Sequence, residues 1–214
     1  MSLYLALDTA TDAPSLALGS PESPGDDRRL PSRRELSREI ELLVRRMLAE
    51  RGTAASALAG VVVGDGPGSF TGLRIGVAFA KGFCRAAALP LLAGPSLMGA
   101  ALAACGGEGA VVAEYDALRG DVYRAVYRFT PGASPGGAAA AGRVEVVAPP
   151  ALVAREQPAD AGLVRAGAAH ASAASLLRLL GFAGALERVA APDRWEPVYG
   201  RLAEAEVRRR ALEP

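Results

Sequence analysis

The segment with the most potential for chemistry is a glycine-rich turn from Gly64 to Gly72, with the sequence Gly-Asp-Gly-Pro-Gly-Ser-Phe-Thr-Gly. It follows a short apolar run and precedes a long helical pattern, a position where free backbone amides and the helix dipole favour an anion. The segment has no lysine for a P-loop, and its glycines lack the dinucleotide-binding spacing. Two interpretations remain: a working or ancestral phosphate loop, and a tight strand-to-helix turn with Thr71 as the helix N-cap.

Three carboxylates are candidates to line a cleft beside this turn, namely Asp8, Asp65 and Asp116. Each lies at or just beyond the end of a predicted strand. Two or three such groups near strand ends can hold Mg²⁺ through water. The alternative is that each carboxylate caps an ordinary turn.

Composition restricts the chemistry further. The chain has one histidine, His170, and two cysteines, Cys84 and Cys105. These numbers exclude sites built on two or more histidines, zinc knuckles and a disulfide framework, and they leave a Ser-His or Cys-His apparatus with one candidate base. Lys81 is the only lysine, so lysine-dependent chemistry would have to use that residue.

The charge balance argues against a strongly basic nucleic-acid-binding protein, because 24 Lys and Arg oppose 23 Asp and Glu in 214 residues. A cluster of Arg28, Arg29, Arg33 and Arg34 could contact RNA phosphates, or it could be a solvated cationic edge strand. No segment approaches the roughly 18 to 20 apolar residues of a membrane span, and the N-terminus lacks the pattern of a signal peptide. These features predict a cytoplasmic protein with no membrane partner.

The elements that position the turn are strands and helices in mixed order. In the first half, hydrophobic periodicity predicts strands at 3–9, 15–19, 59–64 and 89–93, an exposed strand within 20–35, and helices at 36–51, 71–88 and 96–104. In the second half it predicts strands at 110–114, 121–129, 144–147 and 162–166, and helices near 150–155, 170–180 and 199–212. A Pro/Gly/Ala loop separates two of these strands at 130–142. This order predicts an α/β protein with mixed sheets flanked by helices and a boundary near residue 105.

The helix after the glycine turn carries a ridge of small residues at four-residue spacing: Gly72, Gly76, Ala80, Cys84 and Ala88. Other apolar faces leave only a narrow charged stripe, so the helix must be covered on more than one side. A small-residue ridge allows another helix to approach closely. We expect one side to lie on the sheet and the ridge to face the 36–51 helix or a second chain; burial wholly inside this domain is the alternative.

Several motifs together resemble the TsaB family. The most specific is Gly66 to Gly76, Gly-Pro-Gly-Ser-Phe-Thr-Gly-Leu-Arg-Ile-Gly, and Leu7 to Thr11 gives a second match. Further matches follow in order: Leu89-Pro90, Ser96-Leu97-Met98, Asp116-Ala117 with Gly120 to Tyr123, and Glu196 to Tyr199. The resemblance covers nearly the whole chain except the 130–142 loop and the last few residues.

The resemblance implies an actin/Hsp70-like fold of two ribonuclease-H-like lobes, here 1–105 and 106–198, with a C-terminal helix at about 199–212 that can pack back on the first lobe. It also implies a non-catalytic dimerization subunit of the complex that adds a threonylcarbamoyl group to N6 of the tRNA adenosine 3′ of the anticodon. The implied partners are the catalytic subunit TsaD, the ATPase TsaE and tRNA through the complex, with self-association in the absence of TsaD.

The family's dimerization helices correspond to 37–51 and 71–88. The implied partner interface comprises Leu36, Ile40, Leu43, Met47, Gly72, Leu73, Gly76, Ala80, Phe83 and Cys84. The implied vestigial phosphate loop comprises Asp8, Asp65, Gly66, Gly68, Ser69 and Thr71. No catalytic residue, metal or cofactor is expected beyond weak or vestigial binding of ATP and Mg²⁺.

The chain departs from the family at two polar positions. Leu36 stands where many members have histidine, and Leu118 where arginine is usual, with Arg119 one place later. Two other functions remain open: an ATP-dependent phosphotransferase of the same fold using Asp8 and Asp65, and a peptidase, which the single histidine almost excludes.

Overall fold

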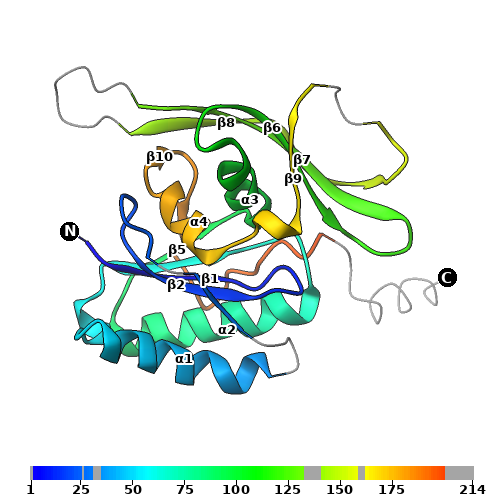
Figure 1. Ribbon diagram of the computed structural model, residues 1–214. Helices are drawn as coiled ribbons and strands as arrows, with labels where there is room; N and C mark the ends of the chain where they lie inside the picture. Colours follow the sequence, from blue (N-terminus) through cyan, green and yellow to red (C-terminus); the bar gives the residue numbers. More distant parts are fainter. Residues whose placement is uncertain (1, 26, 31–34, 133–140, 159–161, 201–214) are drawn as a thin grey trace.

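Four layers make up the molecule in the computed structural model, which describes residues 2–25, 27–30, 35–132, 141–158 and 162–200 (Figure 1). Two helices form the lowest layer in Figure 1. A first sheet lies on them, two further helices lie above that sheet, and a second sheet covers the top.

The first sheet has six strands in the order β11-β5-β4-β1-β2-β3. In that order their bounds are Glu187–Arg188, Leu91–Gly94, Gly60–Gly64, Tyr4–Asp8, Ser15–Gly19 and Arg28–Arg29. β1 and β2 form an antiparallel hairpin, whereas β4 and β5 run parallel to β1. Every residue of β4 is buried because helices cover both faces of the sheet, which confirms the prediction from its unbroken apolar run.

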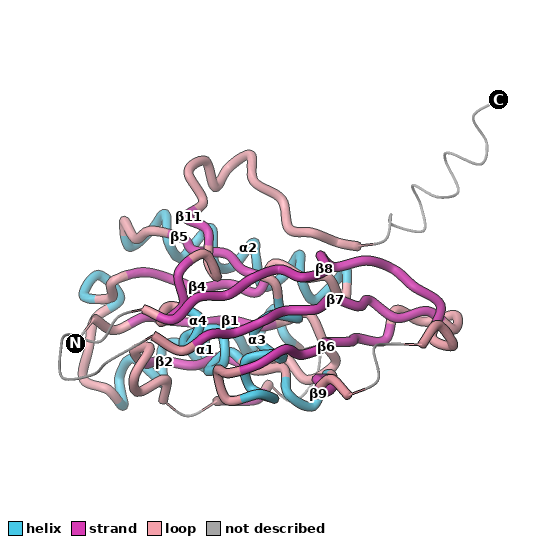
Figure 2. Tube along the Cα trace, turned by 90° about the horizontal axis from the view of Figure 1, so that it is seen from above, coloured by secondary structure: helices cyan, strands magenta, loops and turns pink. Residues whose placement is uncertain are grey.

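The helices divide between the two faces of the first sheet. α1 (Leu36–Glu50) and α2 (Phe70–Ala87) cover its outer face. α3 (Ser96–Cys105) and α4 (Ala173–Leu179) lie between the two sheets (Figure 1). The view from above shows strands of the second sheet crossing over them (Figure 2). Residues 96–102 of α3 are all buried because this helix has neighbours on every side. No helix in the described part of the chain is long and apolar enough to cross a membrane.

The second sheet has five strands in the order β10-β8-β7-β6-β9. In that order their bounds are Phe182–Ala183, Gly142–Ala154, Asp121–Thr130, Gly109–Asp116 and Val164–Ala166. Two short 3₁₀ helices, η1 (Ala55–Ala57) and η2 (Ala168–His170), lie outside the sheets. The predicted alternation along β7 is confirmed because Tyr123, Ala125, Tyr127 and Phe129 are all buried.

Two predicted helices of the second half need correction. The helix near 150–155 is wrong, because β8 continues as a strand through Pro149 and Pro150 to Ala154. β8 pairs with β10 only at Gly142 and Arg143, so the prolines lie on a strand with a free edge, where a missing N–H is tolerated. The helix predicted at 170–180 starts at Ala173, because Ser172 caps it by accepting a hydrogen bond from Ser175 N at 3.0 Å.

The predicted boundary near residue 105 falls at the end of α3. β1 to β5 precede it and β6 to β10 follow it, but β11 joins the first sheet beside β5. One hydrophobic core contains Ala6 and Val62 of the first sheet, Tyr127 of the second and Leu176 of α4. The two sheets therefore share a core, and the division into lobes stays a prediction. The predicted 199–212 helix lies outside the described residues, apart from Tyr199 and Gly200.

Candidate functional site: the glycine loop and the outer helical face

The glycine turn connects the end of β4 to the start of α2. The N-cap of α2 is Ser69, whose Oγ accepts a hydrogen bond from Gly72 N at 3.2 Å, and the helix starts at Phe70. The prediction that Thr71 is the N-cap is therefore wrong, and Thr71 lies exposed in the first helical turn. Both residues can cap a helix, and the two positions differ by about half a turn, which periodicity cannot distinguish.

The turn packs against the hairpin between β1 and β2. Ser69 N donates to the carbonyl oxygen of Ala10 at 2.7 Å. A Cβ on Gly68 would collide with that same carbonyl, and a Cβ on Gly72 would collide with the carbonyl of Thr9. These two positions therefore need glycine because another piece of backbone lies directly on them. An amide that could have bound a phosphate is used within the chain.

Asp8 lies beside the start of the turn, where its Oδ1 would be 3.0 Å from a Cβ on Gly64, the residue before Asp65. Asp8 is only 3% exposed, and its Oδ1 accepts hydrogen bonds from Ala10 N at 3.1 Å and from Ser96 Oγ at 3.0 Å. Its Oδ2 is buried with no hydrogen-bond partner in the described chain. Burial raises the pKa of the Asp8 carboxyl, although these two hydrogen bonds oppose the shift.

The pKa of the Asp65 carboxyl is raised as well. Burial raises the pKa of Asp65 to about 7, with smaller contributions from the charges of Glu187 and Asp8. Tyr127 is nearby, and its hydroxyl is buried without a hydrogen-bond partner in the described chain. The pair is thus a weakly solvated acidic site, but no group of three metal-ligating side chains occurs in the part of the chain that the structure describes.

The third predicted carboxylate lies elsewhere. Asp116 is exposed, and its Oδ1 accepts hydrogen bonds from Leu118 N and from the Arg155 guanidinium, each at 2.8 Å. It therefore caps the β6–β7 turn, which is the alternative raised for it. His170 is exposed as well, and its Nδ1 accepts a hydrogen bond from Gly167 N at 3.2 Å.

Sequence reasoning missed two further members of the acidic site, Ser96 and Tyr115. Ser96 Oγ donates to Asp8, and the Tyr115 hydroxyl donates to the Ser96 carbonyl at 2.9 Å. Ser96 starts a helix and Tyr115 lies on the inward side of a strand, so their burial was predictable. Their contact with Asp8 was not, since 88 residues separate Ser96 from it.

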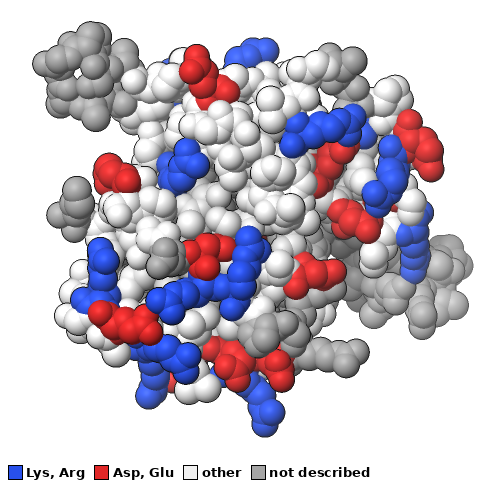
Figure 3. Space-filling view, in the orientation of Figure 1, with Lys and Arg blue, Asp and Glu red and all other residues white. Residues whose placement is uncertain are grey.

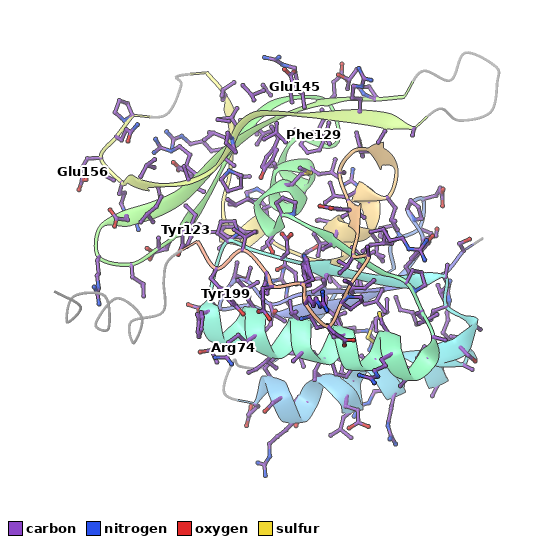
Figure 4. The ribbon with its side chains drawn as sticks, turned by 180° about the vertical axis from the view of Figure 1, so that it is seen from behind. Arg74, Tyr123, Phe129, Glu145, Glu156 and Tyr199 are labelled. Carbon is purple, nitrogen blue, oxygen red and sulfur yellow. The ribbon has the colours of Figure 1, made fainter. Side chains whose placement is uncertain are left out.

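A segment from Trp195 to Gly200, which we call the strap, covers the glycine turn. Val198 N donates to the backbone carbonyl of Asp65 at 2.8 Å. A Cβ on Gly66 would collide with the Val198 carbonyl. The Tyr199 ring packs against Phe70 with the ring planes tilted by 46° and the centroids 4.7 Å apart. Figure 4 shows Tyr199 between Tyr123 of the second sheet and Arg74 of α2.

The small-residue ridge of α2 faces the chain's own sheet, which corrects the expected orientation. A Cβ on Gly76 would collide with the Thr9 side chain, and Ala80 and Cys84 are buried in the core under the first sheet. Most of the predicted interface residues are likewise buried inside this chain: Leu36, Ile40, Met47, Gly72, Leu73, Gly76, Ala80 and Cys84. Small residues here allow α2 to approach a strand end closely rather than a second molecule.

The apolar residues that do reach the surface of these helices form a different set, the outer helical face. Leu42 on α1 is 56% exposed, Ala78 and Gly82 on α2 are exposed, and Leu43, Phe79 and Phe83 are half-buried. A Cβ on Gly82 would have no neighbour within 4 Å. Leu43 and Phe83 are the two predicted interface residues that belong to this face.

The two arginines of the cluster that the structure describes, Arg28 and Arg29, make contacts within the chain. Arg28 pairs with Glu50 at 2.9 Å and Arg29 with Asp27 at 3.0 Å, and Arg29 also donates to the carbonyls of Ala13 and Ala171. Arg33 and Arg34 lie outside the described residues. On the face that Figure 3 shows, cationic and anionic side chains are interspersed.

Comparison with known families and structures defines the class. A family model described as "TsaD: tRNA N6-adenosine threonylcarbamoyltransferase" matches residues 31–159. A Pseudomonas aeruginosa structure titled "YeaZ" has a TM-score of 0.67 at 28% identity and covers 93% of this chain and 100% of its own. A second P. aeruginosa structure, titled as an uncharacterized protein with similarity to peptidase YEAZ, has a TM-score of 0.70 at 28% identity, covering 94% and 100%. The fold is that of the actin/Hsp70-like α/β class.

Curated relatives make the assignment narrower. The TsaB protein of Escherichia coli (strain K12) is 39% identical over 126 residues, which are 58% of this chain and 54% of that protein. The TsaB protein of Haemophilus influenzae is 36% identical over 121 residues, 56% and 51% of the two chains. The chain belongs to the family of the matching model and, within it, to the TsaB proteins. It spans about half the length of the curated relatives it matches.

Proposed function

We propose that the protein is a non-catalytic subunit in the biosynthesis of tRNA threonylcarbamoyladenosine and that it acts by binding and stabilising the catalytic subunit TsaD. Curated relatives are named for this pathway. The observation that carries the proposed mechanism is the outer helical face, where Leu42, Ala78 and Gly82 leave apolar and small surface uncovered on two adjacent helices.

The shape of this face suits another helix. Ala78 and Gly82 are four residues apart on one side of α2, and the small side chain of Ala78 and the lack of one at Gly82 leave a shallow groove along the helix. Ridges of a second helix can enter such a groove at an interaxial distance of about 8–10 Å. Phe79 and Phe83, stacked with their centroids 5.7 Å apart, border the groove. A pair of helices from TsaD packed on α1 and α2 would bury these residues.

In this proposal the acidic site and the glycine turn are structural. The chain alone is expected to have little or no activity, to be cytoplasmic, to self-associate when TsaD is absent, and to meet TsaE and tRNA through the complex. Size-exclusion chromatography with light scattering, with and without TsaD, tests this directly. A failure to form any complex with TsaD would contradict the proposed function.

A substitution on the outer helical face tests whether this surface, rather than another part of the chain, binds TsaD. Gly82→Leu places a large side chain in the groove, and we expect TsaD binding to weaken by about tenfold or more, equivalent to about 1.4 kcal/mol. Ala151→Leu adds the same side chain at an exposed position of β8, on the far side of the molecule, and is the matched control. If both variants bind TsaD equally well, the interface lies elsewhere.

A Mg²⁺-dependent phosphotransferase is the second candidate. The observation in its favour is the buried Oδ2 of Asp8, which has no hydrogen-bond partner in the described chain and could face a hydrated cation. Calorimetry of the chain with Mg-ATP distinguishes the two, since tight binding by the isolated chain would favour the phosphotransferase.

A further inference from the structure

The strap contacts three separate parts of the molecule. Its middle lies on the glycine turn, its first residue on α2, and its last residues on the second sheet. Such a segment can hold the two sheets in a fixed relation. Its individual contacts indicate which residues would do so.

The contact with the glycine turn is made by backbone. The hydrogen bond from Val198 N to the Asp65 carbonyl is 2.8 Å long, and the Val198 carbonyl lies against the Cα of Gly66. Gly66 has a φ of +107°, which strains any residue with a side chain. Glycine at this position is therefore required both by the turn and by the strap that lies on it.

The contact with α2 is made by Lys81, the only lysine in the chain. Its Nζ donates a hydrogen bond to the Trp195 carbonyl, lies 5.7 Å from the centroid of the Trp195 ring, and is 3.9 Å from Glu196 Oε1. The Lys81 side chain is only 22% exposed, whereas that of Glu196 is 68% exposed, so the contact with Trp195 contributes more to this anchor than the ion pair does. Arg85, one turn further along, pairs with Asp193 at 3.8 Å, but both side chains are more than four-fifths exposed.

The contact with the second sheet is made at the other end of the strap. The Tyr123 hydroxyl donates to the Tyr199 carbonyl at 3.4 Å. Gly200 has a φ of +75°, and a Cβ there would lie 2.5 Å from the Tyr123 ring and 2.9 Å from Pro67. The chain thus passes between the glycine turn and the second sheet at a point where only glycine fits.

We propose that the glycine turn is the binding site for the chain's own strap. Residues Trp195–Gly200 act as an intramolecular clamp that connects α2, the glycine turn and the second sheet. The space beside Gly66, where an anion would approach the turn, holds the Val198 carbonyl. The clamp therefore takes the place of a phosphate at this turn. Lys81 is its main polar anchor on α2.

The test uses the chain's single tryptophan, which lies on the strap. In the full-length protein, Lys81→Met keeps the length of the side chain and removes its charge and donors. Arg85→Met is the matched control, because its exposed ion pair contributes little. Acrylamide quenching of Trp195 and the rate of trypsin cleavage after Arg194 are measured for both variants, and far-UV circular dichroism verifies folding. Tyr199→Ala, at the other end of the strap, is a second variant should Lys81→Met fail to fold.

We expect Lys81→Met to increase quenching and to accelerate cleavage by about tenfold, because losing a charged hydrogen bond raises the population of the open strap. Arg85→Met should leave both measurements near those of the wild type. Mg-ATP or inorganic phosphate should not change the Trp195 signal of the wild type. Equal behaviour of the two methionine variants would overturn the proposal, as would a phosphate-dependent change in the wild type.

Discussion

At the scale of single residues, the acidic site is defined by burial. Both Asp8 and Asp65 have the pKa of their carboxyl raised, mainly by burial, and the charge of Asp8 adds to the shift of Asp65. An acid whose pKa is higher in the folded state than in the unfolded state binds more protons when folded. Folding stability therefore falls as the pH rises from the unfolded pKa, near 4, to the folded pKa.

The first prediction concerns Asp65. For this residue the interval extends from pH 3.8 to about 7, so its contribution to stability is lost progressively over that range and changes little above it. Asp65→Asn removes the ionisation, and we expect it to raise the free energy of unfolding at pH 8 by about 1–3 kcal/mol relative to the wild type.

Urea denaturation from pH 5 to pH 8 measures this effect. The difference in free energy of unfolding between wild type and variant should become smaller towards pH 5. Asp116→Asn is the control, because Asp116 is exposed. If this difference in free energy of unfolding stays constant with pH, the Asp65 carboxyl does not titrate in this range.

At the scale of elements, α2 shows what a periodic pattern leaves undetermined. Its ridge of Gly72, Gly76 and Ala80 is real, but two opposite sides of the helix carry small residues, and only one lies on the sheet. The buried side packs on the β1–β2 hairpin, where the Thr9 backbone and side chain need the space. The opposite side, with Ala78 and Gly82, is open.

The second prediction contrasts these two sides. Gly76→Leu inserts a side chain against Thr9 and should lower the free energy of unfolding by about 1–3 kcal/mol or more through overpacking. A Cβ at Gly82 would meet no neighbour within 4 Å, so Gly82→Leu should not lower stability, since leucine is also the better helix former. Thermal denaturation of the isolated chain measures both. An unfolding cost for Gly82→Leu equal to that for Gly76→Leu would contradict this orientation of α2.

Sequence patterns located α2 to within one residue at each end. They also predicted strand β4, because a short apolar run bounded by glycines is typical of a buried strand. They could not orient the helix, since its polar stripe is narrow and both remaining sides are apolar or small. They also predicted a helix at 150–155, where two prolines instead lie on the free edge of β8. The orientation of α2 depends on its contact with Thr9, and the extended conformation of residues 150–154 depends on pairing with β7. Neither contact is visible in the local sequence.

At the scale of the whole molecule, the two sheets are joined by two helices, each of which packs against the sheet that it does not follow in the sequence. α3 follows strands of the first sheet but packs against β6, while α4 follows strands of the second sheet but packs against β1 and β2. Leu176 of α4 is fully buried and lies against Gly99 of α3. This shared layer should couple the two halves in unfolding.

The third prediction follows from this coupling. Leu176→Ala should lower the free energy of unfolding by about 2–5 kcal/mol, the cost of a buried cavity. The loss should shift the Trp195 fluorescence transition and the circular dichroism transition together. Leu42→Ala, at an exposed position on α1, is the control for a lost leucine side chain. Two separate transitions in the variant would mean that the lobes unfold independently.

Most of the order of strands and helices was predictable because the longer strands carry their own periodicity. The strands β10 and β11 were not predicted, because two residues each are too short to show one. The strap was not predictable, even though Glu196 to Tyr199 matches a motif of the TsaB family. Its residues have no periodicity, and their role depends on Asp65, Lys81 and Tyr123, which lie at least 70 residues away.

The tight fit of Gly200 has a practical consequence for protein engineering. Gly200 lies wedged between Pro67 and Tyr123, so any side chain introduced at this position would press on the joint between the two sheets. A labelling site in the strap is better placed at Val198, whose side chain is exposed.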